Sequence, residues 1–396
     1  MPNSCPPPET LDYTIDLLHN ELDALKQCCL VSKSWVPRTR KHLFADIKFR
    51  SASDLESWKK TFPDAANSPA YHARSLLVGC PLLVVASDAE EGGWIRAFSG
   101  VASLGVDNGG RYIYPREISL APFYGFSPTL KSLCVRHIHL PDPQIFDLVR
   151  SFPLLENLRL RGRNFEAVGN DGDPHRLQTI IPSTLAPSLT GSLDLAILGG
   201  VWTAGRQLLD LPNRPHFRKF ACLWDYEEDL GWIMGLVVMC SQTLEFLDIT
   251  CTSCRTSDGI FIRSKTLILF LVVPESASLN FSKVTKLREV VFRPESKNVD
   301  WITMALQTIT PSHRDLRQIS VYVPFHLTRA NVGQGIGEVP LGSWSDLDCL
   351  LVQLWESRSI RPRVGYARQE WQGQSAEYSI GCLFSEATKR GIIDPL

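Results

Sequence analysis

An apolar pattern of the form apolar-x-x-apolar-x-apolar returns along most of this 396-residue chain and restricts its fold more than any other feature. Copies follow one another at steps of about 20 to 35 residues, with a mean of about 27. Alternating apolar residues mark the buried face of a strand. One unit of this length cannot bury its apolar face alone, so neighbouring units must stack. The ten copies are Ala73/Leu76/Val78, Val101/Leu104/Val106, Leu130/Leu133/Val135, Leu155/Leu158/Leu160, Leu189/Leu193/Leu195, Phe217/Phe220/Cys222, Leu244/Leu247/Ile249, Leu267/Phe270/Val272, Leu287/Val290/Phe292 and Leu316/Ile319/Val321.

Helix-like segments at 94–98, 144–149, 229–239 and 301–306 separate several of these copies. Strands and helices that alternate at a regular period predict an α/β chain of stacked βα units. The period and pattern resemble leucine-rich repeats, which run 20–29 residues and begin L-x-x-L-x-L. An ordinary α/β domain remains the alternative, because the steps are uneven. In addition, the Asn or Cys that usually follows the triplet is replaced in the first four copies by Pro81, Gly109, Ile138 and Arg163.

The first fifty residues predict three short helices between Pro6 and Phe44. Leu11, Ile15 and Leu18 recur at helical spacing and form one apolar face. We expect Val36-Pro37 to interrupt the last helix. Such a small unit cannot hide all its apolar side chains internally. They must therefore pack either on the rest of this chain or on a partner, and the residues alone leave both possibilities open.

Residues 8–44 resemble an F-box. The resemblance rests on spaced elements that occur in the expected order: Pro8-Glu9, Leu11 with Ile15, Asp23, the run Val31-Ser32-Lys33-Ser34-Trp35, and Leu43-Phe44. F-boxes usually carry Leu before the first Pro, where this chain has Cys5 and three prolines.

The resemblance implies that this module binds the adaptor Skp1 and, through it, a cullin. The residues that it suggests as Skp1 contacts are Pro8, Leu11, Ile15, Leu18, Val31 and Trp35. Together with the degenerate repeats, the chain resembles a large fungal group of F-box proteins. We therefore expect an F-box at 1–50, a solenoid at 51–360 whose first repeats (51–125) are weak, and a cap or tail at 361–396. The helical run Leu347–Trp355 is expected to cap the solenoid.

What this resemblance implies is a non-catalytic subunit that recruits an unknown substrate protein to a ubiquitin ligase. A repeat scaffold whose F-box-like segment packs on its own solenoid is the second hypothesis, and an α/β enzyme is the third. Trp202, Trp224 and Trp232 are candidates for a substrate-binding patch, although core packing explains them at least as well.

Composition excludes several other classes. The formal net charge of -1 argues against non-specific nucleic-acid binding. No apolar run approaches the ~20 residues of a membrane span, and the first residues do not read as a secretory signal. Eleven cysteines suggest reduced thiols in an intracellular protein, cytoplasmic or nuclear. Cys251 and Cys254 lack a second ligand pair, so neither a metal nor a cofactor is expected.

Overall fold

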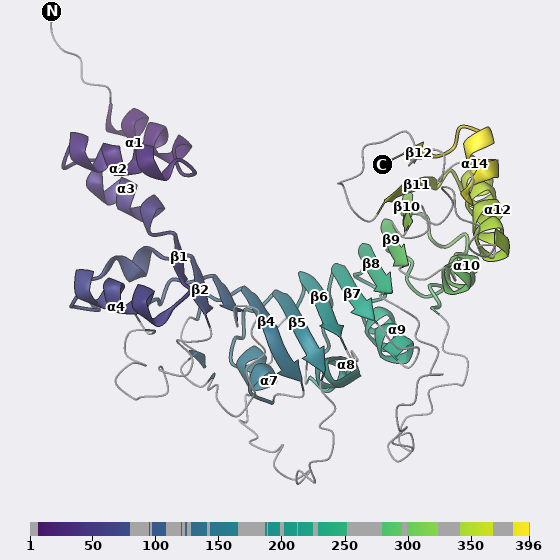
Figure 1. Cartoon of the computed structure of the whole chain (residues 1–396), viewed down its shortest axis with the longest axis horizontal. Coiled ribbons are helices and arrows are strands. Elements are labelled where there is room, and N and C mark those ends of the chain that lie inside the picture. The colour runs from purple at the N-terminus through teal and green to yellow at the C-terminus, as the bar shows by residue number, and fades with distance from the viewer. Residues whose placement is uncertain are drawn as a thin grey trace, which may run out of the picture. The chain divides into compact units, whose positions relative to one another are not determined.

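Figure 1 shows the computed structural model of the whole chain. The chain divides into two compact units. The first holds Met1–Arg159 and Asp171–Ser188, and the second holds Leu160–Asn170 and Leu189–Leu396. The structure describes residues 7–79, 95, 97–107, 120, 123–124, 128–140, 143–164, 187, 189–198, 202–211, 213–224, 229–251, 279–294, 299–323, 341–366 and 383–395.

The first unit begins with three helices, α1 (Pro8–Leu17), α2 (Leu22–Val31) and α3 (Val36–Leu43). Strand β1 (Asp46–Phe49), helix α4 (Ala52–Thr61) and the 3-10 helix η1 (Pro69–His72) follow. The unit continues with β2 (Ser75–Gly79), β3 (Ser103–Asp107), β4 (Ser132–Leu140), α7 (Pro143–Arg150) and the start of β5 (Asn157–Asn164). Pro37 lies in the first turn of α3 and does not interrupt a helix, because a proline in the first turn removes no helical hydrogen bond.

The second unit repeats the alternation of strand and helix. It contains β6 (Ser192–Leu198), α8 (Trp202–Leu209), β7 (Lys219–Trp224), α9 (Asp229–Met239), β8 (Phe246–Cys251), β9 (Glu289–Pro294), α10 (Asp300–Gln307) and β10 (Gln318–Val323). Its last elements are α12 (Leu341–Arg358), β11 (Arg361–Tyr366), α14 (Ser385–Lys389) and β12 (Asp394–Pro395). Helices α8 and α9 lie on the same side of the strands (Figure 1).

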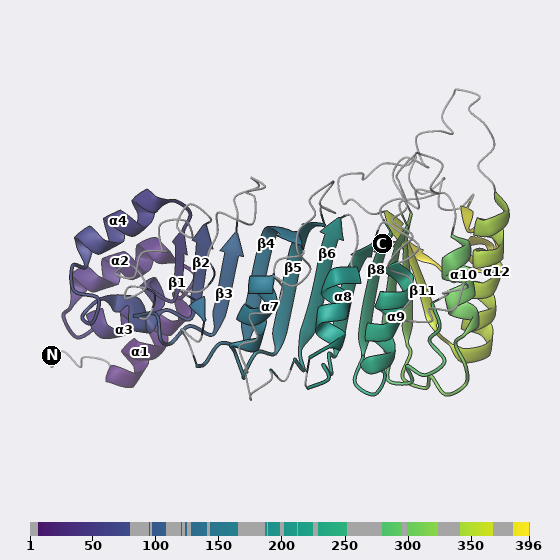
Figure 2. The ribbon, with the colours of Figure 1, turned by 90° about the horizontal axis from the view of Figure 1, so that it is seen from below.

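The strands pair in parallel and in chain order. In the first unit, β1 pairs with β2, β2 with β3 and β3 with β4. In the second unit, each strand from β6 to β11 pairs with the next along the chain, and β11 pairs with β12. Figure 2 shows these strands running side by side. The observed fold is thus α/β, and it is the leucine-rich-repeat-like stack of βα units that the sequence predicts.

The core is made of the predicted apolar triplets. Nine of the ten triplets fall on described residues, and every one of their side chains is buried. Triplets on neighbouring strands meet in register, as Leu193, Phe220 and Leu247 do on β6, β7 and β8. The triplet Leu267/Phe270/Val272 lies outside the described residues, and β8 pairs directly with β9.

Within each unit, a ladder of backbone hydrogen bonds joins neighbouring repeats at the start of their strands. The carbonyl of Arg74 accepts the N–H groups of both Ala102 and Ser103, and the carbonyl of Ala102 accepts those of Lys131 and Ser132. The second unit repeats the arrangement, with Arg218 and Arg288 as two of the acceptors. This ladder satisfies backbone groups at the strand starts with main-chain partners alone.

Several predicted elements are confirmed, and others need correction. Helices α7, α9 and α10 occupy the predicted segments at 144–149, 229–239 and 301–306. Most of the predicted helix at 94–98 lies outside the described residues. The run Leu347–Trp355 is helical, as part of α12, but it does not end the repeats, because β11 continues the sheet after it. Within the described residues, none of the helices is long and apolar enough to cross a membrane.

Candidate partner-binding surface

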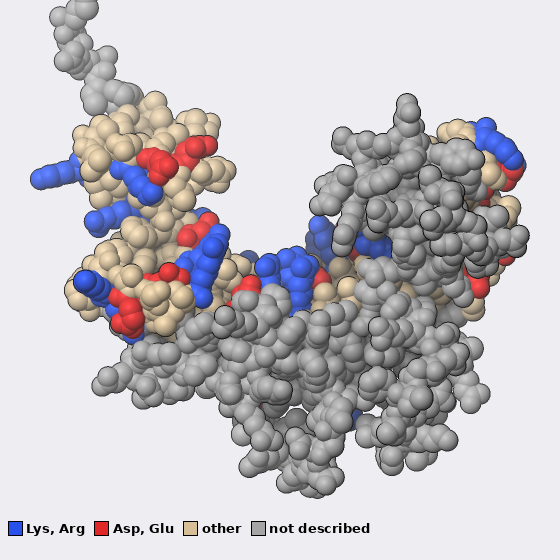
Figure 3. Space-filling view, in the orientation of Figure 1, with Lys and Arg blue, Asp and Glu red and all other residues tan. Residues whose placement is uncertain are grey.

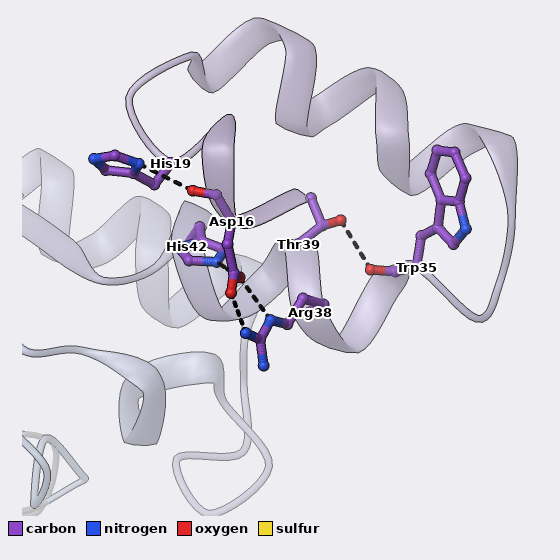
Figure 4. A network of polar contacts seen from close by, with 6 residues as sticks. All are labelled: Asp16, His19, Trp35, Arg38, Thr39 and His42. Carbon is purple, nitrogen blue, oxygen red and sulfur yellow. Dashed lines mark hydrogen bonds and ion pairs between the residues drawn. The ribbon is translucent and has the colours of Figure 1, made fainter. Parts of the chain in front are cut away.

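A three-residue polar contact joins the first helix of the N-terminal module to the third (Figure 4). Asp16 on α1 accepts a hydrogen bond at 2.7 Å from Nε of Arg38 on α3, and a second guanidinium nitrogen of Arg38 donates to its other oxygen. Nε2 of His42, one turn further along α3, lies 2.7 Å from Oδ1 of Asp16. Residues 38–42 of α3 are rich in basic side chains, and two of them, Arg38 and His42, bind α1 to α3. The sequence analysis did not predict this contact.

These contacts keep Asp16 ionised. The hydrogen bonds from Arg38 and then from His42 hold the pKa of the Asp16 carboxyl well below its ordinary value of 3.8. The carboxylate is about a third exposed, so solvent weakens the pair. The geometry is bidentate, however, and this type of arginine–carboxylate pair is among the stronger ones. Asp16 thus fixes how α1 sits on α3.

The turn between α2 and α3 contains the sequence Val31–Trp35. The side chain of Ser32 accepts a hydrogen bond from the backbone N–H of Ser34 at 3.3 Å, which stabilises the turn. Thr39, which is fully buried, donates from Oγ1 to the carbonyl of Trp35 at 2.8 Å. Leu25 of α2 is also fully buried, and α2 packs on α3. The V-S-K-S-W element therefore forms the turn between α2 and α3, and the backbone of Trp35 is held by a buried residue of α3.

The predicted contact residues divide into two groups. Ile15 is only 2% exposed, and Leu11 and Leu18 on the same face of α1 are half-buried. This helical face therefore forms the interior of the module in the free chain. Among the remaining predicted contacts, Trp35 is half-buried and Val31 is exposed, at 66%. Pro8 begins α1, but its side chain is not described.

The exposed apolar residues of the module lie mostly off the predicted face. Five of the ten large apolar side chains that the described chain exposes belong to α1 and α2. We call them the exposed apolar set: Tyr13, Leu17, Leu22, Leu30 and Val31, with exposed fractions from 55% to 81%. Half of the exposed large apolar residues thus fall in a module of under forty residues, which makes this module the candidate partner-binding surface.

Sequence reasoning missed four members of this set, because it sought apolar residues at regular helical spacing. That spacing finds the face that a helix buries on its own neighbours. Tyr13 and Leu17 are four residues apart on α1, away from the face of Ile15. The sequence could have identified the exposed apolar set as the apolar residues of each helix that do not belong to its buried face. Figure 3 shows that much of the module's described surface in this view carries neither acidic nor basic side chains.

The module is attached to the repeats through the end of α3. Phe44 contacts Trp58 and Phe62 of the α4 region in edge-to-face geometry, with ring centroids 5.9 and 5.8 Å apart. The carbonyl of Ala45 accepts the N–H groups of Arg74 and Ser75, so the ladder at the strand starts begins directly after α3. The attachment involves α3 and leaves the exposed apolar set in solvent.

Other sequence candidates do not form a site within the described residues. Trp224 is buried and contacts Trp301, Trp232 is half-buried, and the side chain of Trp202 is not described. Cys251 is buried, whereas Cys254 lies outside the described residues. Among described side chains, no cluster of three or more His, Cys, Asp or Glu residues could hold a metal ion.

Comparison with known proteins adds little beyond this geometry. No protein-family model matches the chain, and no curated protein matches it. Among solved structures, the chain is similar to the leucine-rich repeat-containing protein LegL7 from Legionella pneumophila, with 12% identity and a TM-score of 0.38. The match covers 88% of this chain and 95% of that one. The repeat fold therefore rests on the strand order and the buried triplets of this chain.

Proposed function

We propose that this chain is the non-catalytic substrate-recognition subunit of a Skp1–cullin–F-box ubiquitin ligase. The N-terminal module docks on a Skp1-type adaptor, and the βα repeats bind a target protein. This role places the chain inside the cell, in the cytoplasm, the nucleus or both.

One observation carries the proposal: the exposed apolar set lies on a module whose sequence resembles an F-box. Leu30 is 81% exposed and Val31 is 66% exposed, next to the V-S-K-S-W element. Burying an apolar side chain of this size gains about 1.5–3 kcal/mol relative to leaving it in water. A partner that covers the set therefore has a substantial source of binding free energy.

The mechanism is proximity. An adaptor held at one end and a target held by the repeats raise the effective concentration of the target near the ubiquitin-charged enzyme. This chain then needs no catalytic residue of its own and no cofactor. Its contribution is to keep two binding surfaces on one polypeptide.

The second candidate is a repeat scaffold whose F-box-like segment packs on its own solenoid. The contacts of Phe44 with Trp58 and Phe62 favour it, because they join the end of the module to the repeats. Self-packing of this kind would, however, have to cover Leu17 and Leu30, which are exposed. The ligase subunit is therefore the better account of the apolar surface.

The test is a binding titration with purified Skp1. The double variant Leu30→Ser/Val31→Ser removes two exposed apolar contacts without touching the interior of the module. We expect its affinity to fall at least about tenfold, since ~1.4 kcal/mol corresponds to one decade. Leu154→Ser is the control, because Leu154 is likewise an exposed apolar residue, at 50%, but lies outside the module.

The two candidates give different results. Tight binding by the unchanged chain, retained by the Leu154 control and lost in the double variant, supports the ligase role. No binding by the unchanged, folded chain would favour the scaffold. Equal binding by both variants would reject Leu30 and Val31 as contacts.

A further inference from the structure

The turns that lead into strands β7 to β11 in the second unit are strongly basic. They span 213–219, 241–246, 279–289, 308–318 and 359–361, and they hold nine Lys or Arg residues against three acidic ones. All nine cationic side chains are exposed, and the three acidic side chains are half-buried. We call the cations the basic edge: Arg214, Arg218, Lys219, Lys283, Lys286, Arg288, Arg314, Arg317 and Arg361. An excess of six positive charges gathers here on a chain whose net charge is -1.

Strand pairing brings these residues to one edge of the sheet. Lys219 pairs with Phe246, which pairs with Glu289, and the row continues through Gln318 to Arg361. Parallel strands in register start at the same edge, so the turns before them lie in sequence along it. Figure 2 shows the strands of this unit side by side.

The backbone ladder places Arg218, Glu245, Arg288 and Arg317 at equivalent positions on successive strands. Arg288 accepts hydrogen bonds from Arg317 and Gln318, and Arg317 accepts one from Arg361. Neighbouring strands lie about 4.8 Å apart, so the backbones of Arg288 and Arg317 are about as close. Like charges at neighbouring positions destabilise a sheet. The fold itself therefore gives no reason for this arrangement, whereas an anionic ligand would relieve the repulsion.

Two arginines within strands of this unit pair with an aspartate on the neighbouring strand. Arg161 on β5 pairs with Asp194 on β6 at 2.9 Å. Arg293 on β9 pairs with Asp248 on β8 at 3.1 Å and lies over the ring of Tyr322. At the basic edge, Arg288 contacts Glu245 at 3.4 Å, but no acidic side chain pairs with Arg218, Arg314 or Arg317 in the described chain.

The first unit has no such excess at the equivalent place. Its ladder positions include Arg74 and Lys131, and Lys131 pairs with Glu156 at 3.1 Å. The same backbone role is thus filled there without an excess of cations. The basic edge is therefore a property of the second unit and not of the repeat.

We propose that the basic edge binds an extended acidic segment of a partner protein. The distance from Arg218 to Arg317 covers three strand spacings, about 14 Å, which about four or five residues of an extended chain span. Single-stranded nucleic acid fits less well, because proteins that bind it usually stack its bases on exposed aromatic side chains. Phe217 and Phe281 of the same turns are buried. This inference rests on the proposed function, in which the repeats bind a target protein, and it specifies that the bound segment of the target is acidic.

The experiment measures binding of a fluorescent peptide by the full chain without Skp1. The probe is a peptide of about ten residues that alternates Glu and Ser, and a Gln/Ser peptide of equal length is the uncharged control. We expect binding of the Glu peptide alone, weakened at least about tenfold when salt rises from about 0.05 M to about 0.5 M, as screening requires. Because Skp1 is absent, failure here is separate from failure of the adaptor docking.

Two matched variants locate the site. Arg288→Gln/Arg317→Gln should weaken peptide binding about tenfold or more, while Arg74→Gln/Lys131→Gln, at the equivalent ladder positions of the first unit, should leave it unchanged. Arg288→Lys/Arg317→Lys should retain most of the binding, because it keeps the charge. Circular dichroism checks that each variant folds.

Three outcomes would overturn the proposal. The first is that the folded chain does not bind the Glu peptide. The second is that the Gln variants of the first and second units lose peptide affinity equally. The third is that the chain binds a single-stranded RNA more tightly than the Glu peptide. The last result would assign the basic edge to nucleic acid.

Discussion

The carboxylate of Asp16 connects two of the three N-terminal helices. Arg38, Arg40, Lys41 and His42 form a basic run on α3, and cations at the end of a helix usually complement its dipole. In the structure, Arg38 and His42 instead reach across to Asp16. A short module with a small apolar interior depends on such polar contacts for a defined arrangement. The position of the exposed apolar set therefore depends on one acidic residue.

Asp16→Asn should loosen α1. An amide cannot form the charge-assisted pair with Arg38, so about 1–2 kcal/mol of local stability is lost, after discounting for solvent. Hydrogen exchange of the α1 amides should become about tenfold faster. Asp12→Asn, on an exposed residue of the same helix, is the control and should change little. Unchanged exchange in Asp16→Asn would contradict the role assigned to this contact.

The pH dependence of the same contact has a definite sign. The pKa of the Asp16 carboxyl is lower in the folded chain than its ordinary value of 3.8. The stability it adds is therefore complete above that value and is lost as the pH falls toward the lowered pKa. Between about pH 5 and pH 3, α1 exchange, corrected for the intrinsic rate, should accelerate in the unchanged chain more than in Asp16→Asn.

At the scale of elements, α4 shows how local chemistry sets a helix that the sequence analysis did not predict. Ser51 and Asp54 form a reciprocal capping box, in which the Ser51 side chain accepts from the Asp54 N–H and Asp54 accepts from the Ser51 N–H. The helix presents Trp58 to Phe44, Phe49 and Phe62. Its cap therefore supports the aromatic cluster that joins the module to the repeats.

Ser51→Ala should destabilise α4 by about 1 kcal/mol, the usual cost of losing an N-cap side chain. Hydrogen exchange of the α4 amides provides the measurement, and Ser57→Ala inside the same helix is the control. Ser57 is exposed and mid-helical, where alanine is at least as favourable. If the α4 amides exchange at the same rate in both variants, the capping box contributes nothing to the stability of α4.

Helix α12 is also an element whose role depends on its surroundings. Its apolar spacing suggested a cap, but α12 connects β10 to β11 and packs on α10. Asp348 on this helix accepts hydrogen bonds from the N–H groups of Glu386 and Ala387 at 2.7 and 3.0 Å. Burial raises the pKa of this carboxyl despite those bonds. Residues 361–396 therefore hold two further strands of the sheet.

At the scale of the whole molecule, the boundary between the module and the repeats lies earlier than the predicted residue 50. Strand β1 (Asp46–Phe49) pairs with β2 and belongs to the sheet. Phe44 also belongs to the aromatic cluster of the repeats. A cut after residue 50 would remove a sheet strand together with the F-box-like helices.

Two shortened chains test this boundary. A chain that starts at Phe44 keeps β1, whereas one that starts at Ser51 loses the buried side chains of Ile47 and Phe49 and exposes the apolar residues that they cover, which promotes association. Size-exclusion chromatography should show the Phe44 chain as a monomer and the Ser51 chain as larger species or a loss of soluble protein. Identical behaviour of the two would place the boundary where the sequence analysis put it.

The fold was predicted correctly where the repeated apolar triplet determines the structure. Apolar residues at alternate positions must leave water, and the described triplets do so on successive parallel strands. Strand β1 and helix α4 were missed, because Asp46–Phe49 is too short to show the repeat and α4 buries no residue fully. The predicted contact residues were only partly informative, since the periodic face of α1 includes the buried Ile15.

The sequence by itself determined the α/β repeat and the three short helices, because both follow from the spacing of apolar residues along the chain. The tertiary structure decided which side chains remain exposed and which charges find partners. Leu17 and Leu30 are exposed because Ile15 and Leu25 fill the interior of the module. Arg218, Arg288 and Arg317 form one edge because strands far apart in sequence pair in register. These contacts between distant residues carry the two proposed binding surfaces.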